Sequence, residues 1–156
     1  MMHRMVSAAL ALAGLLLSVY LWLYKIGALG ALACGDGACE RVQLSPYARI
    51  LGVPVAFVGV VGYAAILFVA LLGVQPRFAS RRWPTDVLVV LSTGGLVFSA
   101  YLTYLEAAVI HAWCRWCIGS AVIIGSIFAG ALTGWIQWTR GGRPASAADR
   151  HHDASR

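Results

Sequence analysis

Residues 111–138 read HAWCRWCIGSAVIIGSIFAGALTGWIQW and join a Cys-x-x-Cys pair to a long apolar run. Between Cys117 and Trp138 the run carries no charged side chain. A helix rises about 1.5 Å per residue, so a run of this length can cross the roughly 30 Å hydrocarbon core of a membrane. The stretch therefore predicts a membrane-spanning helix over residues 117–138 with two cysteines at its beginning.

Three further apolar runs have the length and composition of membrane spans, at residues 5–24, 55–74 and 87–105. The chain of 156 residues is 60% hydrophobic and 12% charged, whereas soluble domains average about 45–50% apolar and about 25% charged residues. The first run could instead be a cleaved secretory signal, but Lys25 separates it from a cleavage-like site at residues 31–33. We predict an all-α integral membrane protein, with a four-transmembrane-helix bundle in residues 1–139 and a disordered tail in residues 140–156.

The longest connection, residues 26–53, carries the other two cysteines, Cys34 and Cys39. Glycines in its first half predict a flexible arm, because glycine has the greatest backbone freedom. Ser45-Pro46 has the pattern of a helix start, with serine as the cap and proline in the first turn. We expect a short amphipathic helix at the membrane interface to follow, with an apolar side formed by Tyr47, Ile50 and Leu51.

The basic residues indicate how the chain is oriented. Four spans place both termini and the connection at residues 75–86 on one side of the membrane. Of the 12 lysines and arginines, eight lie on that side, and the other four are Lys25, Arg41, Arg49 and Arg115. Because positively charged loops stay in the cytoplasm, we expect an inner (cytoplasmic) membrane protein with cytoplasmic termini and all cysteines on the outer face. The basic residues are scattered between apolar runs, which argues against binding of nucleic acid.

The positions of the cysteines favour redox chemistry. A Cys-x-x-Cys at a helix start places its sulfurs one turn apart, and the positive helix end favours the thiolate of Cys114. Arg115 and His111 could add positive potential, and Glu106 or His111 could supply protons. A pair on a flexible arm could reach this fixed pair, so we predict a thiol–disulfide relay. Structural disulfides within each pair, and a zinc site of all four cysteines, are the alternatives; we predict no metal.

Electrons that reach Cys114 and Cys117 need an acceptor within the membrane. A quinone is lipid-soluble and takes two electrons, as many as a dithiol releases, so we expect a menaquinone, a ubiquinone or a quinone of the vitamin K type. Cys117, deeper in the helix, is the candidate to react with it, and Cys114 is the candidate to exchange with the loop. We expect the pocket to include Ser45, Gly59, Ser99, Thr103 and Trp113.

Four short motifs accompany the cysteines: SPYA at residues 45–48, GVPV at 52–55, SAYLTYLE at 99–106 and WCRWC at 113–117. Together with the order of the spans, these motifs resemble the bacterial form of the vitamin K epoxide reductase family over residues 8–138. The resemblance implies a four-helix bundle around a quinone pocket, with the disulfide of Cys114 and Cys117 as the active site.

By the same resemblance, Cys117 would contact the quinone, Cys114 would exchange with Cys39, and Cys34 would exchange with a thioredoxin-like (DsbA-like) protein that makes disulfide bonds in secreted proteins. Many bacterial members carry a fused thioredoxin-like domain; none is present here, so we expect a separate partner. Animal members hold the quinone with an asparagine, which this chain lacks, and with a tyrosine that Ala121 replaces here. Quinone reduction is therefore expected rather than epoxide reduction.

Two other functions fit parts of this pattern. The DsbB-like quinone reductases also have four helices and four cysteines, but their Cys-x-x-Cys lies in the first outer loop, the reverse of the order found here. A non-enzymatic membrane protein braced by structural disulfides would need neither a quinone nor exchange between the two pairs.

Overall fold

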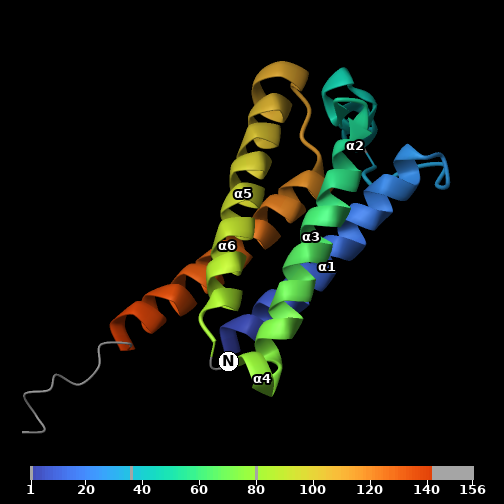
Figure 1. Ribbon diagram of the computed structural model, residues 1–156. Coiled ribbons are helices and arrows are strands. Elements are labelled where there is room, and N and C mark those ends of the chain that lie inside the picture. The colour runs from blue at the N-terminus through green and yellow to red at the C-terminus, as the bar shows by residue number, and fades with distance from the viewer. Residues whose placement is uncertain (1, 36, 80, 142–156) are drawn as a thin grey trace, which may run out of the picture.

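Four long helices dominate the part of the chain that the structure describes (Figure 1). The computed structural model describes residues 2–35, 37–79 and 81–141. Its long helices are α1 (Met2–Lys25), α3 (Val55–Val74), α5 (Trp83–Leu105) and α6 (Arg115–Gly141). Each of the four contains a segment long and apolar enough to cross a membrane, which confirms the predicted all-α membrane fold. Of the tail predicted to be disordered, residues 140 and 141 belong to α6, and residues 142–156 lie outside the described residues.

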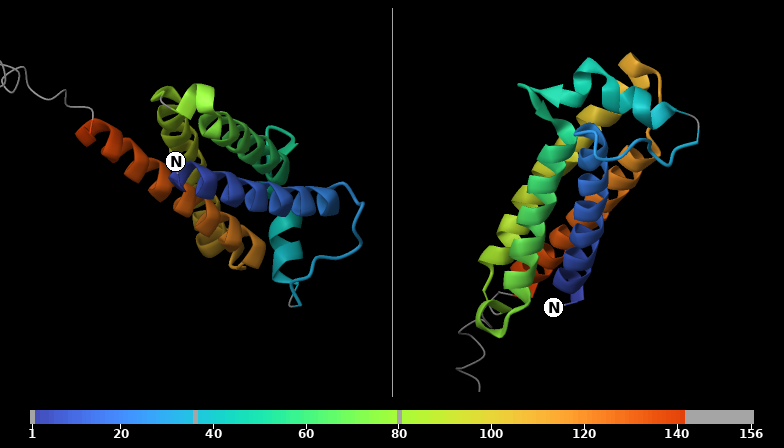
Figure 2. Two further views of the ribbon diagram at one scale, coloured as in Figure 1. Left: turned by 90° about the horizontal axis from the view of Figure 1, so that it is seen from below. Right: turned by 90° about the vertical axis from the view of Figure 1, so that its right-hand side faces the viewer.

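The helices pack as a bundle in which α1 contacts α3 and α6, while α5 contacts α6 and α3. Helices α1 and α3 run side by side, and the C-terminal half of α6 extends away from the other three (Figures 1 and 2). Glycines allow the close approach of α1 and α3. A Cβ atom at Gly14 would collide with the ring of Tyr63, and one at Gly59 would lie 2.8 Å from the hydroxyl oxygen of Ser18. Small residues at helix interfaces have this role in membranes.

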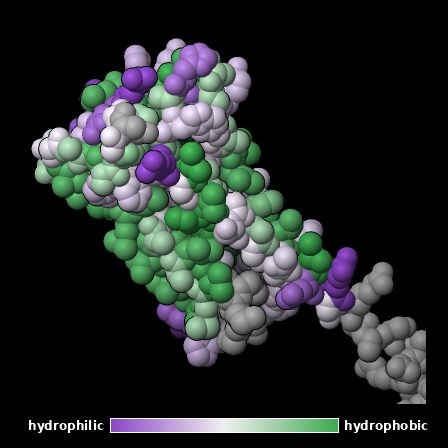
Figure 3. All heavy atoms as spheres, turned by 180° about the vertical axis from the view of Figure 1, so that it is seen from behind, coloured by the Kyte–Doolittle hydropathy of each residue, from purple (hydrophilic) through white to green (hydrophobic). Residues whose placement is uncertain are grey.

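The outer surface of the bundle is apolar. Hydrophobic side chains cover the middle of the molecule, and hydrophilic ones gather towards its two ends (Figure 3). Large apolar side chains on the helices are exposed, among them Phe68, Val90, Val97 and Val122. In water such an exposed apolar surface would favour aggregation, whereas in a membrane lipid tails solvate it without a free-energy penalty. The protein is therefore a multi-pass membrane protein surrounded by a lipid bilayer.

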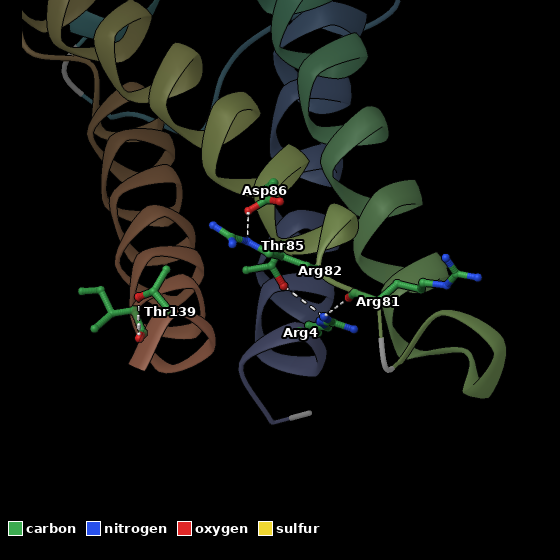
Figure 4. Close-up of polar contacts among 7 residues, drawn as sticks. Arg4, Arg81, Arg82, Thr85, Asp86 and Thr139 are labelled. Carbon is green, nitrogen blue, oxygen red and sulfur yellow. Dashed lines mark hydrogen bonds and ion pairs between the residues drawn. The ribbon is translucent and has the colours of Figure 1, made fainter. Parts of the chain in front are cut away.

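Arg4 ties three segments together at the end of the bundle that holds the N-terminus (Figure 4). Its side chain is only 2% exposed. Nη1 donates a hydrogen bond of 2.7 Å to the carbonyl oxygen of Gly73, and Nη2 donates bonds of 3.0 Å to the carbonyl oxygen of Arg81 and to Oγ1 of Thr85. One guanidinium group thus joins the start of α1 to the end of α3 and the start of α5.

Replacing Arg4 with methionine should lower the free energy of unfolding by about 2–3 kcal/mol, because buried acceptors lose charged hydrogen-bond donors. Thermal unfolding in detergent micelles measures the effect. Arg77→Met is the matched control: Arg77 is exposed and stands over the ring of Phe78, so its loss should change stability by less than about 0.5 kcal/mol. Equal effects of the two substitutions would contradict the role assigned to Arg4.

The connection from α1 to α3 contains a helix that the sequence did not predict, α2 (Ala38–Leu44). It follows Gly37, whose φ of +69° suits glycine, and it carries Cys39. A disulfide joins Cys39 to Cys34. The residues before Cys34 are held as well: the carboxylate of Glu40 accepts the N–H of Leu32, and the hydroxyl of Tyr20 accepts the N–H of Ala33. The arm expected to be flexible is therefore fastened to α1 and α2.

The segment after α2 also differs from the prediction. Ser45 precedes a helical turn that has Pro46 at its start, as predicted, but its hydroxyl forms no cap bond to that turn and donates instead to the carbonyl oxygen of Val42, in α2. A single 3-10 turn follows, η1 (Pro46–Ala48), and then a hairpin of β1 (Arg49–Ile50) and β2 (Val53–Pro54). Leu51 and Gly52 form its turn with φ values of +52° and +85°. Because a two-residue hairpin turn of this kind imposes left-handed backbone at both positions, Tyr47–Leu51 cannot continue as an amphipathic helix.

Helix α5 begins earlier than the predicted third span, and a further helical turn follows its predicted end. It begins at Trp83, with Pro84 in its first turn, and beyond Leu105 it continues as one π-helical turn, η2 (Glu106–Ile110). His111, with φ +52°, ends the turn. The predicted ten-residue connection before α6 therefore shrinks to residues 111–114. Single π-helical turns are frequent at functional sites, and this one directs Glu106 towards the cysteines.

Candidate active site

All four cysteines belong to one apolar cluster, which lies at the end of the bundle opposite the N-terminus (Figures 1 and 2). Cys34, Cys39 and Cys114 are buried, with 3%, 0% and 0% of their surface exposed, and Cys117 packs against them. Cys34 and Cys39 form a disulfide with their Cα atoms 6.0 Å apart. Cys114 and Cys117 are free thiols. The tertiary structure thus brings together two pairs that lie far apart in the sequence, as the predicted relay requires.

Cys114 occupies the position just before the first residue of α6. Its carbonyl oxygen accepts the N–H of Ile118 at 3.0 Å, and its sulfur accepts the N–H of Cys117 at 3.4 Å. A sulfur in this cap position faces the positive end of the helix. The hydrogen bond from the Cys117 side chain lowers the pKa of Cys114, although burial of the sulfur works against it. Of the two free thiols, Cys114 is therefore the one that forms a thiolate more easily.

The pH dependence of Cys114 alkylation should reveal this contact. Because the Cys117 side chain is the largest cause of the lowered pKa of Cys114, Cys117→Ala should raise that pKa and move the rise in alkylation rate to higher pH. Iodoacetamide labelling of the reduced protein across a pH series, with the Cys114 peptide quantified by mass spectrometry, measures the shift. Ser126→Ala, an exposed position on the same helix, should leave the curve in place. A curve that moves to lower pH in Cys117→Ala would refute the assignment.

Glu106 lies beside Cys114 and Cys117, the two free cysteines. Its side chain is 3% exposed, and its Oε2 accepts the N–H of Cys114 at 3.1 Å. Its backbone carbonyl accepts the N–H of Ala112 at 3.2 Å. The backbone and the side chain of Glu106 therefore both stabilise the turn before α6. The carboxyl group also interacts with the side chain of Cys117. Among the described residues, Glu106 is the acidic group that contacts both cysteines.

His111 and Arg115, the other residues expected to support the cysteines, are exposed. Water screens charges at such positions, so their influence on the buried sulfurs is small. The short turn explains their placement: residues 111–114 must bring Ala112 and Cys114 inward, and the alternation of the backbone leaves His111, Trp113 and Arg115 outside.

A cavity of about 270 Å³ lies between the four long helices, and Cys117 forms part of its wall. Most of the lining is apolar, and its polar members are Ser18, Gln43, Tyr63, Ser99 and Ser120. Gly62 and Gly94 also line it, and a Cβ atom at either position would meet no atom within 4 Å. These glycines leave room for a flat group. The size is close to the lower end of the range for small-molecule sites, roughly 300–1,000 Å³.

The cavities separate the residues that were expected to form a pocket. Gly59 and Ser99 line the larger cavity, and Ser45 lines a smaller one of about 30 Å³ that also touches Glu106 and Cys117. Thr103 and Trp113 are not among the described residues that line either cavity. The hydroxyl of Thr103 donates to the carbonyl oxygen of Ser99 within α5, and Trp113 is 54% exposed.

Sequence reasoning missed four polar residues of the cavity wall: Ser18, Gln43, Tyr63 and Ser120. Gln43 was missed because α2 was not predicted; a helix there would have placed it on the same face as Cys39, four residues earlier. Only a weak indication in the sequence marks Tyr63 as functional, because it is the single tyrosine in the apolar run at residues 55–74. Its hydroxyl bonds to the carbonyl and hydroxyl oxygens of Ser120, both at 2.9 Å.

The residues present fit a quinone. The cavity is mostly apolar and has the thiol of Cys117 in its wall, and the thiol of Cys114 and the carboxyl group of Glu106 lie near Cys117. A zinc site of all four cysteines fits less well, because the disulfide uses two of the four sulfurs. Within residues 2–35, 37–79 and 81–141, no group of three or more histidine, cysteine or acidic side chains is arranged to hold a metal ion.

Comparison with known families agrees with this geometry. The sequence matches the family model described as "Vitamin K epoxide reductase family" over residues 5–132. The match covers the first three long helices almost completely, most of α6, and both cysteine pairs.

Proposed function

Because the chain belongs to the vitamin K epoxide reductase family, a family of membrane thiol oxidoreductases, we propose that it carries electrons from a thioredoxin-like protein to a membrane quinone. One observation carries the proposal: Cys117 lines the apolar cavity, while Cys114 lies in the same buried cluster as the Cys34–Cys39 disulfide. One thiol of the pair thus faces a site for an acceptor, and the other faces a source of electrons.

The first exchange would take place at Cys34. A thiolate of the partner attacks the Cys34 sulfur and releases Cys39 as a thiolate. The second thiol of the partner then attacks its own sulfur in the mixed disulfide and releases Cys34. The partner leaves with a new disulfide, and Cys34 and Cys39 have gained two electrons and two protons. Because Cys34 is buried against α1, the arm has to open for this exchange.

The second exchange would pass these electrons inward. Cys39 attacks Cys114 in the Cys114–Cys117 disulfide and releases Cys117, and Cys34 then attacks Cys39 and releases Cys114. This restores the Cys34–Cys39 disulfide and leaves Cys114 and Cys117 reduced. The structure has the same arrangement, a Cys34–Cys39 disulfide with free thiols at Cys114 and Cys117.

In the last step, Cys114 and Cys117 form their disulfide and lose two electrons and two protons. A bound quinone would accept the two electrons and the two protons and leave as a quinol. The lowered pKa of Cys114 favours its thiolate, which closes the disulfide on Cys117. Glu106 and Cys117 line the same small cavity, and the Glu106 carboxyl would take the proton from that thiol.

The proposed orientation places the cysteines on the outer face of the cytoplasmic membrane. Arg4, Arg81 and Arg82 gather at the opposite end of the bundle (Figure 4), Arg77 lies in the same connection between α3 and α5, and positively charged ends stay in the cytoplasm. The thiol partner would then be a thioredoxin-like (DsbA-like) protein outside the membrane, and the physiological result would be disulfide formation in secreted proteins.

Reconstitution tests the proposal. Purified protein in lipid nanodiscs, given a reduced thioredoxin-like protein and a short-chain quinone, should form one quinol for each disulfide that appears in the partner. Quinone absorbance and thiol titration follow the two products. Disulfides that only brace the outer loops would give no quinol, and that result would refute the proposed function.

A further inference from the structure

We propose that Gln43 is the hydrogen-bond donor that holds a quinone oxygen beside Cys117. This inference rests on the proposed function and names a residue for it that no sequence motif marks. Gln43 is 6% exposed and lines both cavities that touch Cys117. Its amide nitrogen lies 4.0 Å from the Cys117 sulfur. A group that reacts at that sulfur therefore comes within reach of the amide.

Among the described residues, the two N–H groups of the Gln43 side-chain amide have only a weak acceptor. A glutamine amide nitrogen carries two N–H groups. Among the described residues, the contact recorded for this nitrogen is the long one to the Cys117 sulfur, and sulfur is a weak acceptor. Buried N–H groups normally have a good acceptor, because leaving one without costs free energy. A carbonyl oxygen of a ligand in the cavity would be such an acceptor.

Two other polar groups of the cavity wall are committed to each other. The hydroxyl of Tyr63 donates to the carbonyl oxygen of Ser120 and also bonds to its hydroxyl oxygen. Gln43 also suits the chemistry, because negative charge grows on a quinone oxygen as electrons arrive, and an N–H dipole aimed at that oxygen stabilises it. Since an amide is neutral, it does so without adding a charge to an apolar cavity.

The position of Gln43 is held from two sides. The ammonium group of Lys25, the last residue of α1, donates to the backbone carbonyl oxygen of Gln43. One residue earlier, the carbonyl oxygen of Val42 accepts both the N–H and the hydroxyl of Ser45. These bonds cap the last turn of α2. Lys25 is therefore a positioning residue for the Gln43 amide.

Infrared spectroscopy of a bound short-chain quinone tests the contact directly. A hydrogen bond lowers the stretching frequency of a quinone carbonyl. With the fully oxidised protein, which cannot consume the quinone, one carbonyl band should be shifted down relative to free quinone. In Gln43→Leu this shift should disappear, and the dissociation constant of the quinone, measured by tryptophan fluorescence quenching, should rise about tenfold. Gln43→Asn, which keeps the amide on a shorter stem, should recover part of the shift.

Gln137→Leu is the matched control, because Gln137 is exposed near the far end of α6; it should leave both the band and the dissociation constant unchanged. An intact Cys34–Cys39 disulfide and an unchanged melting temperature in Gln43→Leu would show that the variant folds. Lys25→Met should weaken quinone binding in the same direction, and Lys25→Arg should restore it.

A folded Gln43→Leu protein that keeps the wild-type dissociation constant, and whose bound quinone keeps the carbonyl shift of the wild-type protein, would overturn this inference while the wild-type protein still reduces quinone. Absence of quinone binding and reduction in the wild-type protein would overturn the proposed function itself. The two failures are therefore distinguishable in one set of measurements.

Discussion

Replacing Cys117 with alanine lowers the rate of quinol formation by on the order of 10³-fold or more, whichever thiol donor is supplied. Cys114→Ala should have the same effect, because neither sulfur can complete a disulfide alone and release two electrons. Cys34→Ala should behave differently. It should abolish transfer from a thioredoxin-like donor, but a small dithiol such as dithiothreitol can reduce the Cys114–Cys117 disulfide directly and should still drive quinol formation.

Comparing the two donors in all the cysteine variants separates the outer pair from the inner pair. Quinone absorbance gives the rate, and the wild-type protein with each donor gives the reference. If Cys117→Ala reduced quinone at a normal rate with dithiothreitol, the inner pair would not be the site of electron transfer. If Cys34→Ala lost activity with both donors, the outer pair would be needed for more than contact with the partner.

The same variants can capture the exchange between the pairs. In Cys34→Ala, Cys39 has lost its disulfide partner, and its place in one buried cluster with Cys114 favours a bridge between these two. Mass spectrometry of the unreduced protein after proteolysis should detect a Cys39–Cys114 peptide pair. Bridges confined to each pair under all redox conditions would mean that the relay does not operate.

Glu106→Gln should slow quinol formation about 10²-fold while the fold persists, because the amide still accepts the N–H of Cys114 but cannot take up a proton. Glu106→Leu should be slower still and should lower the free energy of unfolding by about 1–3 kcal/mol, because the buried N–H of Cys114 then has no acceptor. Turnover and thermal unfolding of both variants test the two roles separately.

Glu40→Gln is the matched control for Glu106→Gln. Glu40, in α2, also accepts a backbone N–H, that of Leu32, at 3.2 Å, but it is not among the residues that line the cavity. Its replacement should change the rate of quinol formation with dithiothreitol by less than about twofold. A normal rate in Glu106→Gln would mean that Glu106 holds the turn before α6 and takes no part in proton transfer.

The four membrane spans could be predicted because the bilayer imposes its own length and polarity on a sequence. A run such as residues 55–74 must be helical, since its backbone N–H and C=O groups have no water to bond with. The role of Cys114 as a cap was predictable for a related reason: the Cys-x-x-Cys spacing and the start of an apolar run locate the helix end. Each of these features depends on the sequence of its own segment, so it can be predicted without knowing which other parts of the chain pack against it.

The surroundings of the cysteines were not predictable in the same way. Helix α2 is seven residues long, too short to be stable alone, and it exists because Cys39 is tied to Cys34 and packs against the bundle. Gln43 enters the cavity only by way of that helix. Glu106 reaches Cys114 only because η2 adds a π-helical turn after α5.

The membrane fold, the grouping of the cysteines into two pairs along the chain and the expectation of a redox role thus follow from apolar length and cysteine spacing in the sequence, because lipid and helix geometry act on each segment separately. The proximity of the two pairs, the acid beside them and the amide in the cavity depend on contacts between α1, α2, η2 and α6. Such contacts form only once the helices have packed, since each side chain reaches its partner from a different element.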